Sequence, residues 1–448
     1  MLNIIVAISN LVFRTSKDMK NLAIITICFL LVQCEPVVPQ QSSINKKIIF
    51  DNYEYEDIVG FSKLYPTENG QLKELENPVI SLRQEEQLIL TFDLLTDEFE
   101  NLSANIYHCN KDWTRSGLRD MEFLSQINNY RITDFDYSVN TVQPYINYRF
   151  SVPKPTLSGN YILAVHRRAN PDDLIFTRRF MVVDGAVSID HTVRVSTTIA
   201  ERDENHQIEY SVNYGNLMVN SPTQDIGTVL LQNHNWSTAI TDVQPTLIRA
   251  NEGYMEFRHL DLKTNFNGWN EFRFADLRTL NVAGRNVGRI TNTGSKIYAP
   301  LKLDGTRGNI TYTQNFQDIN GNFIIQNNDP GEGQLNADYA NVTFALKSEP
   351  INGEVYVIGQ FNNWRITDIN RMRYTNQNGL GRYETSLSLK QGYYEYLYYA
   401  KSDELPPYHF EGSHFQAENE YEILVYYRKP GNINDELIGY KRFRSIER

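Results

Sequence analysis

Alternation of apolar and polar residues with a period of two recurs along most of the chain, whereas the helical period of 3.6 residues is almost absent. Such alternation is typical of strands that bury one face. Strands are predicted in the first third at 46–50, 87–93, 105–109, 145–152, 160–166 and 176–183. Turn-rich segments at 153–159 and 168–173 separate some of them, with the spacing of a β-sandwich. Only 112–125 could hold a helical turn.

The same pattern continues towards the C-terminus. Further strands are predicted at 192–198, 207–214, 227–232, 246–250, 254–260, 270–278, 340–346, 355–357, 381–389 and 392–399. Residues 305–338, which lie between the strand at 270–278 and the strand at 340–346, are rich in Asn, Gly, Gln and Asp. We therefore predict an all-β protein of tandem immunoglobulin-like or early-set β-sandwich domains. The predicted modules are 46–186, 187–304 and 338–448, with 305–337 as a linker or long excursion.

An apolar segment precedes the first strand. Leu22 to Val32 is shorter than the roughly 20 residues that a membrane-spanning helix needs, and it has the length of the hydrophobic region of a signal peptide. A short basic region, Met19-Lys20-Asn21, lies directly before it. We therefore expect residues 1–34 to be an export signal with Met19 as the true start, followed by a flexible tether at 35–45.

The export segment ends at a cysteine. Leu31-Val32-Gln33-Cys34 resembles a bacterial lipoprotein box, in which cleavage before the cysteine leaves it to carry a lipid. Gln33 departs from the small residue that the box requires. Two outcomes stay open: lipid attachment at Cys34, which places the protein on the inner leaflet of the outer membrane, or ordinary signal-peptide cleavage, which releases a soluble protein.

Composition narrows the function classes. The chain of 448 residues has the length for two to four domains. Its net charge of −11 gives no basic surface for nucleic acid, and its 12% of aromatic residues favours strands. Cys109 is the one cysteine outside the export segment, so no intramolecular disulfide is possible. It is expected to be a small buried hydrophobic residue rather than a reactive thiol.

Motifs for chemistry are missing from the sequence. The eight histidines show no zinc-binding spacing, and there is no Gly-x-Ser-x-Gly elbow or phosphate-binding loop. The segment 318–322 begins like a calcium loop, but Asp329 stands where that loop needs a glutamate, so an ordinary turn is the preferred interpretation. We expect no enzymatic activity, no catalytic residue, no metal and no cofactor.

Two tryptophans are candidates for contact with a partner or ligand. The motif Gly359-x-Phe-Asn-x-Trp364, which follows a Val-Tyr-Val strand, and the later Gly392-x-Tyr-x-Tyr396 resemble the glycogen-binding type of early-set domain. That resemblance implies sugar stacking on Trp364, but the second tryptophan of the sugar platform is missing, so a structural role is the alternative. Trp113 lies beside arginines in a polar insertion, where it either meets a partner or packs its own domain.

Longer stretches resemble the type IX secretion system plug protein family. They lie at 107–113, 270–278, 318–323, 337–344, 390–394, 411–414, 418–428 and 435–439, so the resemblance covers about 46–448. It implies a non-enzymatic periplasmic protein that docks on the giant outer-membrane barrel translocon and seals its periplasmic opening. The alternative function is a carbohydrate-binding lipoprotein that acts through the C-terminal module and Trp364.

Overall fold

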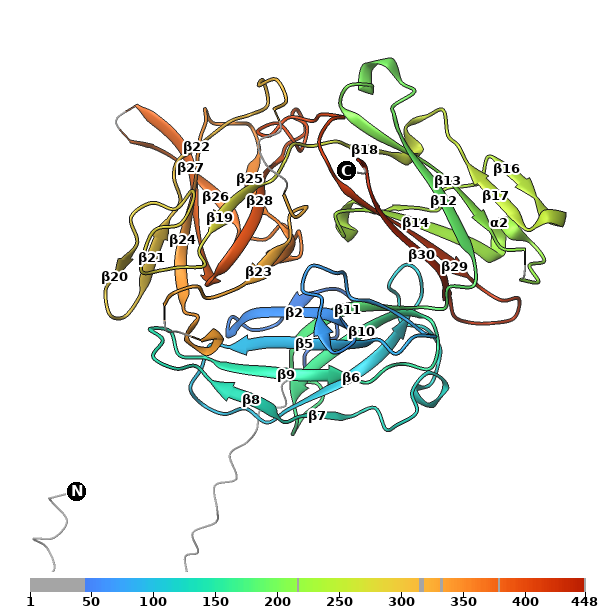
Figure 1. Cartoon of the computed structure of the whole chain (residues 1–448), viewed down its shortest axis with the longest axis horizontal. Coiled ribbons are helices and arrows are strands. Elements are labelled where there is room, and N and C mark those ends of the chain that lie inside the picture. Colours follow the sequence, from blue (N-terminus) through green and yellow to red (C-terminus); the bar gives the residue numbers. More distant parts are fainter. Residues whose placement is uncertain (1–44, 216, 314–317, 331–332, 378, 447–448) are drawn as a thin grey trace, which may run out of the picture. The chain divides into compact units, whose positions relative to one another are not determined.

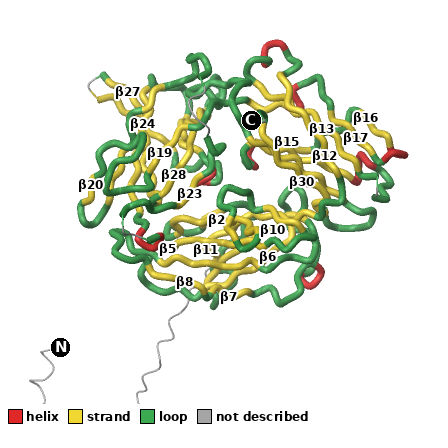
Figure 2. Tube along the Cα trace, in the orientation of Figure 1, coloured by secondary structure: helices red, strands yellow, loops and turns green. Residues whose placement is uncertain are grey.

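Strands make up 45% of the chain and helices 6%, which confirms the predicted all-β class. In this computed structural model the described residues are 45–446, without 216, 314–317, 331–332 and 378. Lys46–Arg448 forms one compact unit. Figure 2 shows this unit as strands joined by long loops, with helices only as short turns. The export segment and Cys34 lie outside the described residues.

The first block is a sandwich of two sheets with strand orders β1-β11-β10-β6-β7, to which β4 adds beside β11, and β3-β2-β5-β9-β8. In its core the Phe92 ring contacts the rings of Tyr148 and Phe176, with centroid distances of 5.0 and 4.9 Å. The strands are β1 Tyr53–Glu54, β2 Val59–Glu68, β3 Gln71–Leu72, β4 Val79–Ser81, β5 Gln87–Leu94, β6 Leu102–Cys109, β7 Tyr130–Ile132, β8 Asp134–Tyr137, β9 Ile146–Val152, β10 Gly159–Arg167 and β11 Leu174–Val183.

The second block pairs strands from the middle of the chain with the last two strands. Its sheets have the orders β12-β13-β17-β16, with β18 beside β13, and β15-β14-β29-β30. Figure 1 shows the C-terminal strands in red alongside β14 in green. The strands are β12 Ser188–Val195, β13 Asn205–Asn213, β14 Ile226–Gln232, β15 Ile240–Thr241, β16 Leu247–Arg249, β17 Tyr254–Phe257, β18 Asn265–Asn267, β29 Glu420–Tyr427 and β30 Glu436–Arg444.

The third block is a ten-stranded sheet that folds around its own core. Its order is β19-β28-β25-β26-β27-β24-β21-β20, with β22 beside β24 and β23 beside β28. The strands are β19 Arg273–Asp276, β20 Thr291–Asn292, β21 Ile297–Pro300, β22 Asp304–Gly305, β23 Phe323–Ile325, β24 Tyr339–Lys347, β25 Glu354–Ile358, β26 Arg371–Gln377, β27 Leu380–Lys390 and β28 Gly392–Lys401.

Short helical turns connect the strands. The described turns are η1 Asp120–Glu122, η2 Ile199–Glu201, α2 Pro222–Asp225, η3 Trp236–Thr238, η4 Ala250–Glu252, η5 Leu262–Thr264, η6 Gln334–Asn336 and η7 Gln360–Asn362. The turn predicted within 112–125 is η1. Within the described part of the chain, no helix has the length and apolarity to span a bilayer.

Strand pairing differs from the predicted module boundaries at two places. β29 and β30, which the sequence places in the C-terminal module, pair with β14 in the second block. β19, β21 and β22, which lie before residue 306, pair with strands of the third block. Alternation reports which face of a strand is buried, whereas the partner strand depends on contacts far along the sequence. The sequence boundaries therefore do not follow the sheets.

The strand predicted at 46–50 is wrong, because residues 46–49 have no strand pairing. Ile48 and Phe50 still pack against a buried cluster, which explains the alternation. Lys46 instead binds the Asp173 carboxylate at 2.9 Å, the Leu174 carbonyl oxygen at 2.8 Å and the Glu56 carboxylate. This start of the folded unit is therefore held by ion pairs.

Candidate functional site

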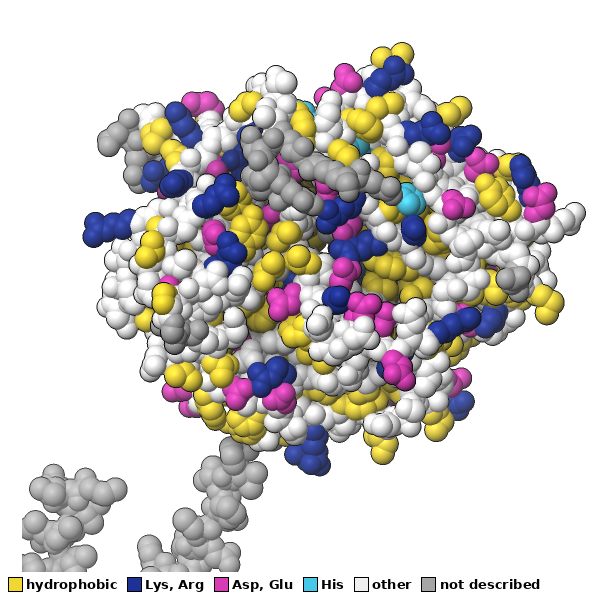
Figure 3. Space-filling view, in the orientation of Figure 1, with side chains coloured by type: hydrophobic (Ala, Val, Ile, Leu, Met, Phe, Trp, Pro, Cys, Tyr) yellow, Lys and Arg dark blue, Asp and Glu magenta, His cyan; other side chains and the backbone are white. Residues whose placement is uncertain are grey.

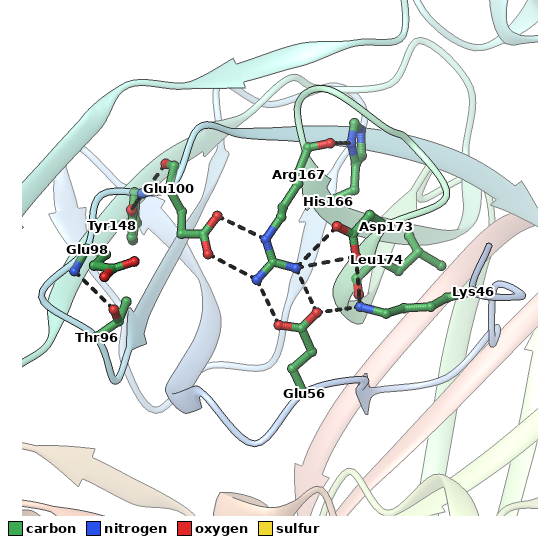
Figure 4. Close-up of polar contacts among 10 residues, drawn as sticks. All are labelled: Lys46, Glu56, Thr96, Glu98, Glu100, Tyr148, His166, Arg167, Asp173 and Leu174. Carbon is green, nitrogen blue, oxygen red and sulfur yellow. Dashed lines mark hydrogen bonds and ion pairs between the residues drawn. The ribbon is translucent and has the colours of Figure 1, made fainter. Parts of the chain in front are cut away.

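Arg167 organises the charged cluster to which Lys46 belongs (Figure 4). Its guanidinium donates to both carboxylate oxygens of Glu56 at 2.7 and 2.9 Å and to both of Glu100 at 2.9 and 3.0 Å. The Arg167 hydrogen bonds lower the pKa of Glu56 to about 2, against the opposing effect of burial. The cluster connects residues before β1 to the end of β10, so it fixes the point at which the chain joins the fold.

The four tryptophans of the chain gather in one region. We call it the tryptophan junction, defined by Trp113, Trp236, Trp269 and Trp364. Trp113 packs edge-to-face on Trp236, with ring centroids 4.9 Å apart, and the Arg179 guanidinium lies 4.3 Å from the Trp113 ring. Trp236 and Trp364 line one cavity, and Trp269 and Trp364 line a second. The junction thus joins loops from all three blocks.

Both tryptophans that were candidates for contact are largely buried. The exposed fraction is 6% for Trp113 and for Trp364. Trp364 packs edge-to-face on Phe272 and lies against Gly321, where an added Cβ would come within 2.4 Å of its ring. A sugar stacks on an open ring face, so this burial favours the structural alternative at both positions. The structure brings Trp113 and Trp364 to the same junction.

Unusual backbone conformations concentrate at the junction. A positive φ is rare for residues other than glycine, and for a bulky residue it is a true outlier. Six such residues belong to the loops of the junction: Trp113 (63°), Asn233 (52°), His234 (55°), Trp269 (55°), Asn363 (53°) and Trp364 (59°). Strained residues of this kind persist only where the surrounding structure holds them, and they are frequent at functional sites.

The first cavity has a volume of about 370 Å³ and a charged wall. Its basic residues are Lys63, Arg178, Arg179 and Arg365. The Lys63 ammonium donates to the Asn322 side-chain oxygen at 2.7 Å and to the Phe323 carbonyl oxygen at 2.8 Å. Burial lowers the pKa of Lys63 to about 7.

The three arginines of this wall have two carboxylate partners. Arg178 and Arg365 both bind Glu54, the latter at 3.2 Å, and Arg179 binds Asp51 at 3.1 Å. Figure 3 shows basic and acidic side chains close together in the central part of this face, with hydrophobic side chains around them. The lining of the first cavity has four Lys or Arg residues and two acidic residues, Asp51 and Glu76, whereas the chain as a whole is acidic.

The second cavity has a volume of about 190 Å³ and is mainly aromatic and aliphatic. Trp269 and Tyr399 stack in its wall, with ring centroids 6.4 Å apart and an interplanar angle of 29°. The amides of Gln232, Asn233 and Asn235 also line it. The two cavities share Ser237, Trp364 and Ile366, so Trp364 separates a charged space from an apolar one.

Buried polar contacts connect the first and third blocks. The Asp93 carboxylate on β5 accepts from the Lys390 ammonium at 2.6 Å, from the Tyr339 hydroxyl at 2.6 Å and from the Asn147 amide at 2.7 Å. Asp93 is 0% exposed and Lys390 is 4% exposed. Burial deprives both charges of hydration. Their mutual attraction offsets this cost only while both are present.

The second block is joined to the first in a similar way. The Tyr426 hydroxyl on β29 donates to the Asn160 side-chain oxygen on β10 at 2.8 Å. The Lys111 backbone N–H donates to the Asp435 carboxylate at 2.9 Å. Polar contacts that span long distances in the sequence therefore join the first block to each of the other two.

The calcium-like segment forms a turn. The Asp318 carboxylate accepts from the backbone N–H of Phe272 and of Asn320, and the Glu395 carboxylate accepts from Ile319 and Gly321. Burial raises the pKa of Asp318 to about 7. Among the described residues there is no group of three or more His, Cys, Asp or Glu side chains that could hold a metal.

Comparison with known families identifies the first block. Residues 62–184 match the family described as type 9 secretion system plug protein 1st domain. The chain belongs to the type 9 secretion system plug protein family. This plug family is a component of the type IX secretion system, so the chain takes part in that system, with a location in the periplasm or at the outer membrane.

One solved structure is similar to this protein over most of the chain. The crystal structure of a hypothetical protein from Parabacteroides merdae ATCC 43184 matches with a TM-score of 0.82 and 30% sequence identity. The match covers 89% of this chain and 100% of the other. No curated protein sequence matches the chain. The shared fold thus includes the second and third blocks, beyond the matched family domain.

Sequence reasoning missed Trp236, Trp269 and the basic wall of this plug-family chain. One signal was available: each tryptophan comes shortly after an asparagine, as in Asn110-Lys-Asp-Trp113 and Asn233-His-Asn-Trp236. Asparagine tolerates the left-handed backbone region and is frequent in tight turns. The basic wall had no such signal, because Lys63, Arg178 and Arg365 come from distant segments.

Proposed function

We propose that this protein docks on the giant outer-membrane barrel translocon of the type IX secretion system and seals its periplasmic opening without enzymatic activity. The match of residues 62–184 to the plug protein family is the observation that carries this proposal. A stopper acts through surface complementarity, so it requires a well-packed body and no reacting groups.

The contacts between blocks support a role that depends on rigidity. A flexible chain of modules would leave gaps when the blocks move relative to one another. Here Asp93 and Lys390 hold the first block to the third, and Asn160 and Tyr426 hold it to the second. These buried contacts form only when the blocks lie together, so they fix the position of each block relative to its neighbour.

We further propose that a lipid on Cys34 attaches the protein to the inner leaflet of the outer membrane. Eleven residues separate Cys34 from Lys46, where the Arg167 cluster begins. At about 3.3–3.6 Å per residue, a fully extended segment of this length spans roughly 40 Å. The body would therefore reach a barrel mouth near the membrane surface while staying attached.

Affinity purification tests the docking proposal. Tagged protein recovered from outer-membrane extracts in mild detergent is expected to retain the barrel translocon, as identified by mass spectrometry. Deletion of the gene is expected to increase sensitivity to vancomycin, which a sealed outer membrane excludes. Folded protein that retains no barrel, together with unchanged sensitivity in the deletion strain, would refute the proposal.

A matched pair of cysteine variants tests the lipid separately. In cells that lack the barrel translocon, Cys34→Ser is expected to move the protein from the membrane fraction to the soluble periplasmic fraction. Cys28→Ser, a few residues earlier in the apolar segment, is expected to leave it in the membrane fraction. Equal fractionation of both variants and the parent protein would show that Cys34 carries no anchor, without bearing on docking.

A further inference from the structure

The tryptophan junction contains two adjoining cavities of different chemistry. The first has a charged wall and the second is aromatic, and both are bounded by Ser237, Trp364 and Ile366. Ile366 is 39% exposed and Ile369 in the same loop is 70% exposed, so apolar surface continues outwards from this shared boundary. A ligand that fills both cavities must carry one charged and one apolar group close together.

The charge of the first cavity selects the sign of the charged group. In the described part of the chain, Arg178 and Arg365 share Glu54 as their one carboxylate partner. Lys63 binds two neutral oxygen atoms among the described residues. Arg178 and Arg365 together carry one positive charge more than Glu54 balances, and Lys63, with a pKa of about 7, adds to this charge when it is protonated.

The remaining charges in this wall are balanced in pairs. Arg179 is paired with Asp51, and Glu76 is paired with Arg442. The excess positive charge thus lies on the side formed by Lys63, Arg178 and Arg365. A carboxylate is the anion that proteins supply to such a site, because arginine binds it with paired hydrogen bonds.

The second cavity selects an apolar side chain. Trp269, Phe272, Leu397 and Tyr399 present rings and methyl groups, and a volume of about 190 Å³ accommodates one large side chain. The amides of Gln232, Asn233 and Asn235 also line this cavity and form hydrogen bonds within the protein, so the apolar side chains supply its selectivity.

We propose that the junction binds an extended peptide segment in which an aspartate or glutamate is next to a bulky apolar residue. The carboxylate lies between Lys63 and Arg365, the apolar side chain enters the cavity beside Trp269, and the backbone crosses Ser237 and Trp364. This activity goes beyond sealing, because it recognises the chemistry of a partner segment in addition to the shape of an opening.

A neutral glycan fits the junction less well. It gains nothing from a partly balanced positive wall, and it requires an open ring face on which to stack. Trp364 is 6% exposed, and Trp269 and Tyr399 already stack on each other. Trp269 and Trp364 both have a positive φ, a conformation that persists only where the surrounding structure holds it, so neither ring turns outwards easily to stack on a sugar.

Selection from a phage-displayed library of random heptapeptides tests this proposal on the folded full-length protein. Enriched sequences are expected to place Asp or Glu directly beside Leu, Ile, Phe, Tyr or Trp. A synthetic peptide from the enriched set is then titrated by calorimetry beside its carboxamide analogue, in which the acidic side chain is replaced by its amide. The analogue is expected to bind at least tenfold more weakly.

Two protein variants assign the site. Lys63→Gln and Arg365→Gln are expected to weaken binding of the enriched peptide at least tenfold each. Arg371→Gln is the control, since Arg371 is 46% exposed, pairs with Glu354 and lines neither cavity, so it should bind like the parent.

Three results would overturn the proposal: enrichment without acidic residues, equal affinity for the peptide and its carboxamide analogue, or retention of soluble glucans in place of peptides. The comparison of peptide with analogue needs no altered protein, so it decides the matter even if Lys63→Gln fails to fold. Loss of peptide binding would leave translocon docking and vancomycin exclusion untouched, so the two proposals fail separately.

Discussion

Replacing Lys390 by methionine tests whether buried charge holds the first and third blocks together. Methionine has a similar length but no charge, so Lys390→Met leaves the Asp93 carboxylate at 0% exposure without its cation. Breaking a buried ion pair on one side costs about 3–5 kcal/mol. Tyr339 and Asn147 continue to donate to Asp93, so we expect a loss near the lower limit, about 3 kcal/mol.

Guanidinium unfolding monitored by tryptophan fluorescence measures this loss. For a denaturant slope of about 6 kcal/mol/M, a loss of 3 kcal/mol lowers the midpoint by roughly 0.5 M. The double variant Asp93→Asn/Lys390→Met removes both charges and is expected to recover most of the free energy of unfolding, because the remaining groups are neutral and still hydrogen-bonded. Lys401→Met, in an ion pair where the lysine is 59% exposed, is the control and should leave the midpoint unchanged.

Two outcomes would refute this reasoning. A change below 1 kcal/mol in Lys390→Met would mean that water reaches Asp93 or that the blocks separate before unfolding. A double variant that is no more stable than Lys390→Met would mean that packing of the lysine side chain, and not its charge, makes the contribution.

Three further predictions concern a glycine at a packed turn, a buried histidine and the Arg167 cluster. Gly321→Ala should lower the free energy of unfolding by about 1–3 kcal/mol, because the added Cβ meets the Trp364 ring. Gly294 has a similar positive φ but open space around it, so Gly294→Ala should lower the free energy of unfolding by less. Equal losses for the two variants would contradict the packing argument. Burial lowers the pKa of His206 to about 4. The folded state therefore binds fewer protons than the unfolded state between pH 6.5 and 4. The free energy of unfolding is expected to fall by about 3 kcal/mol as the pH drops through this window. Urea unfolding at pH 7 and pH 4 should therefore show a smaller pH dependence for His206→Gln than for the parent, and equal slopes would refute it. Arg167→Met should lower the free energy of unfolding by about 2 kcal/mol, less than for a fully buried ion pair because the cluster is partly exposed. An unchanged thermal midpoint would show that the cluster does not contribute to stability.

The sequence predicted individual strands well and their partners poorly. β5, β10 and β28 lie within a few residues of their predicted positions, because a strand that buries one face alternates apolar and polar residues. β2 was not predicted, since its face alternation is interrupted by Pro66 and its burial is uneven. Pairing of β14 with β29 could not be predicted, because no local pattern identifies a partner so far along the chain.

The candidate site was predictable only in part. Gly359-x-Phe-Asn-x-Trp364 marked Trp364 as unusual, and its asparagine-containing turn was the same kind of signal that precedes the other tryptophans. The basic wall depends on Lys63 and Arg178, which lie on strands of opposite sheets in the first block, and on Arg365 from the third. Convergence of this kind is a property of tertiary structure, and neither composition nor spacing reports it.

The placement of β29 and β30 beside β14 determines the order in which parts of the polypeptide can fold. A chain that emerges N-terminus first, from a ribosome or a translocase, can complete the first block as soon as β11 has appeared. The edge of β14, by contrast, stays without its neighbour until almost the last residue has been delivered, and an unpaired edge is open to wrong pairing. Early termination of synthesis would consequently damage the middle of the molecule, a place remote in sequence from the missing piece.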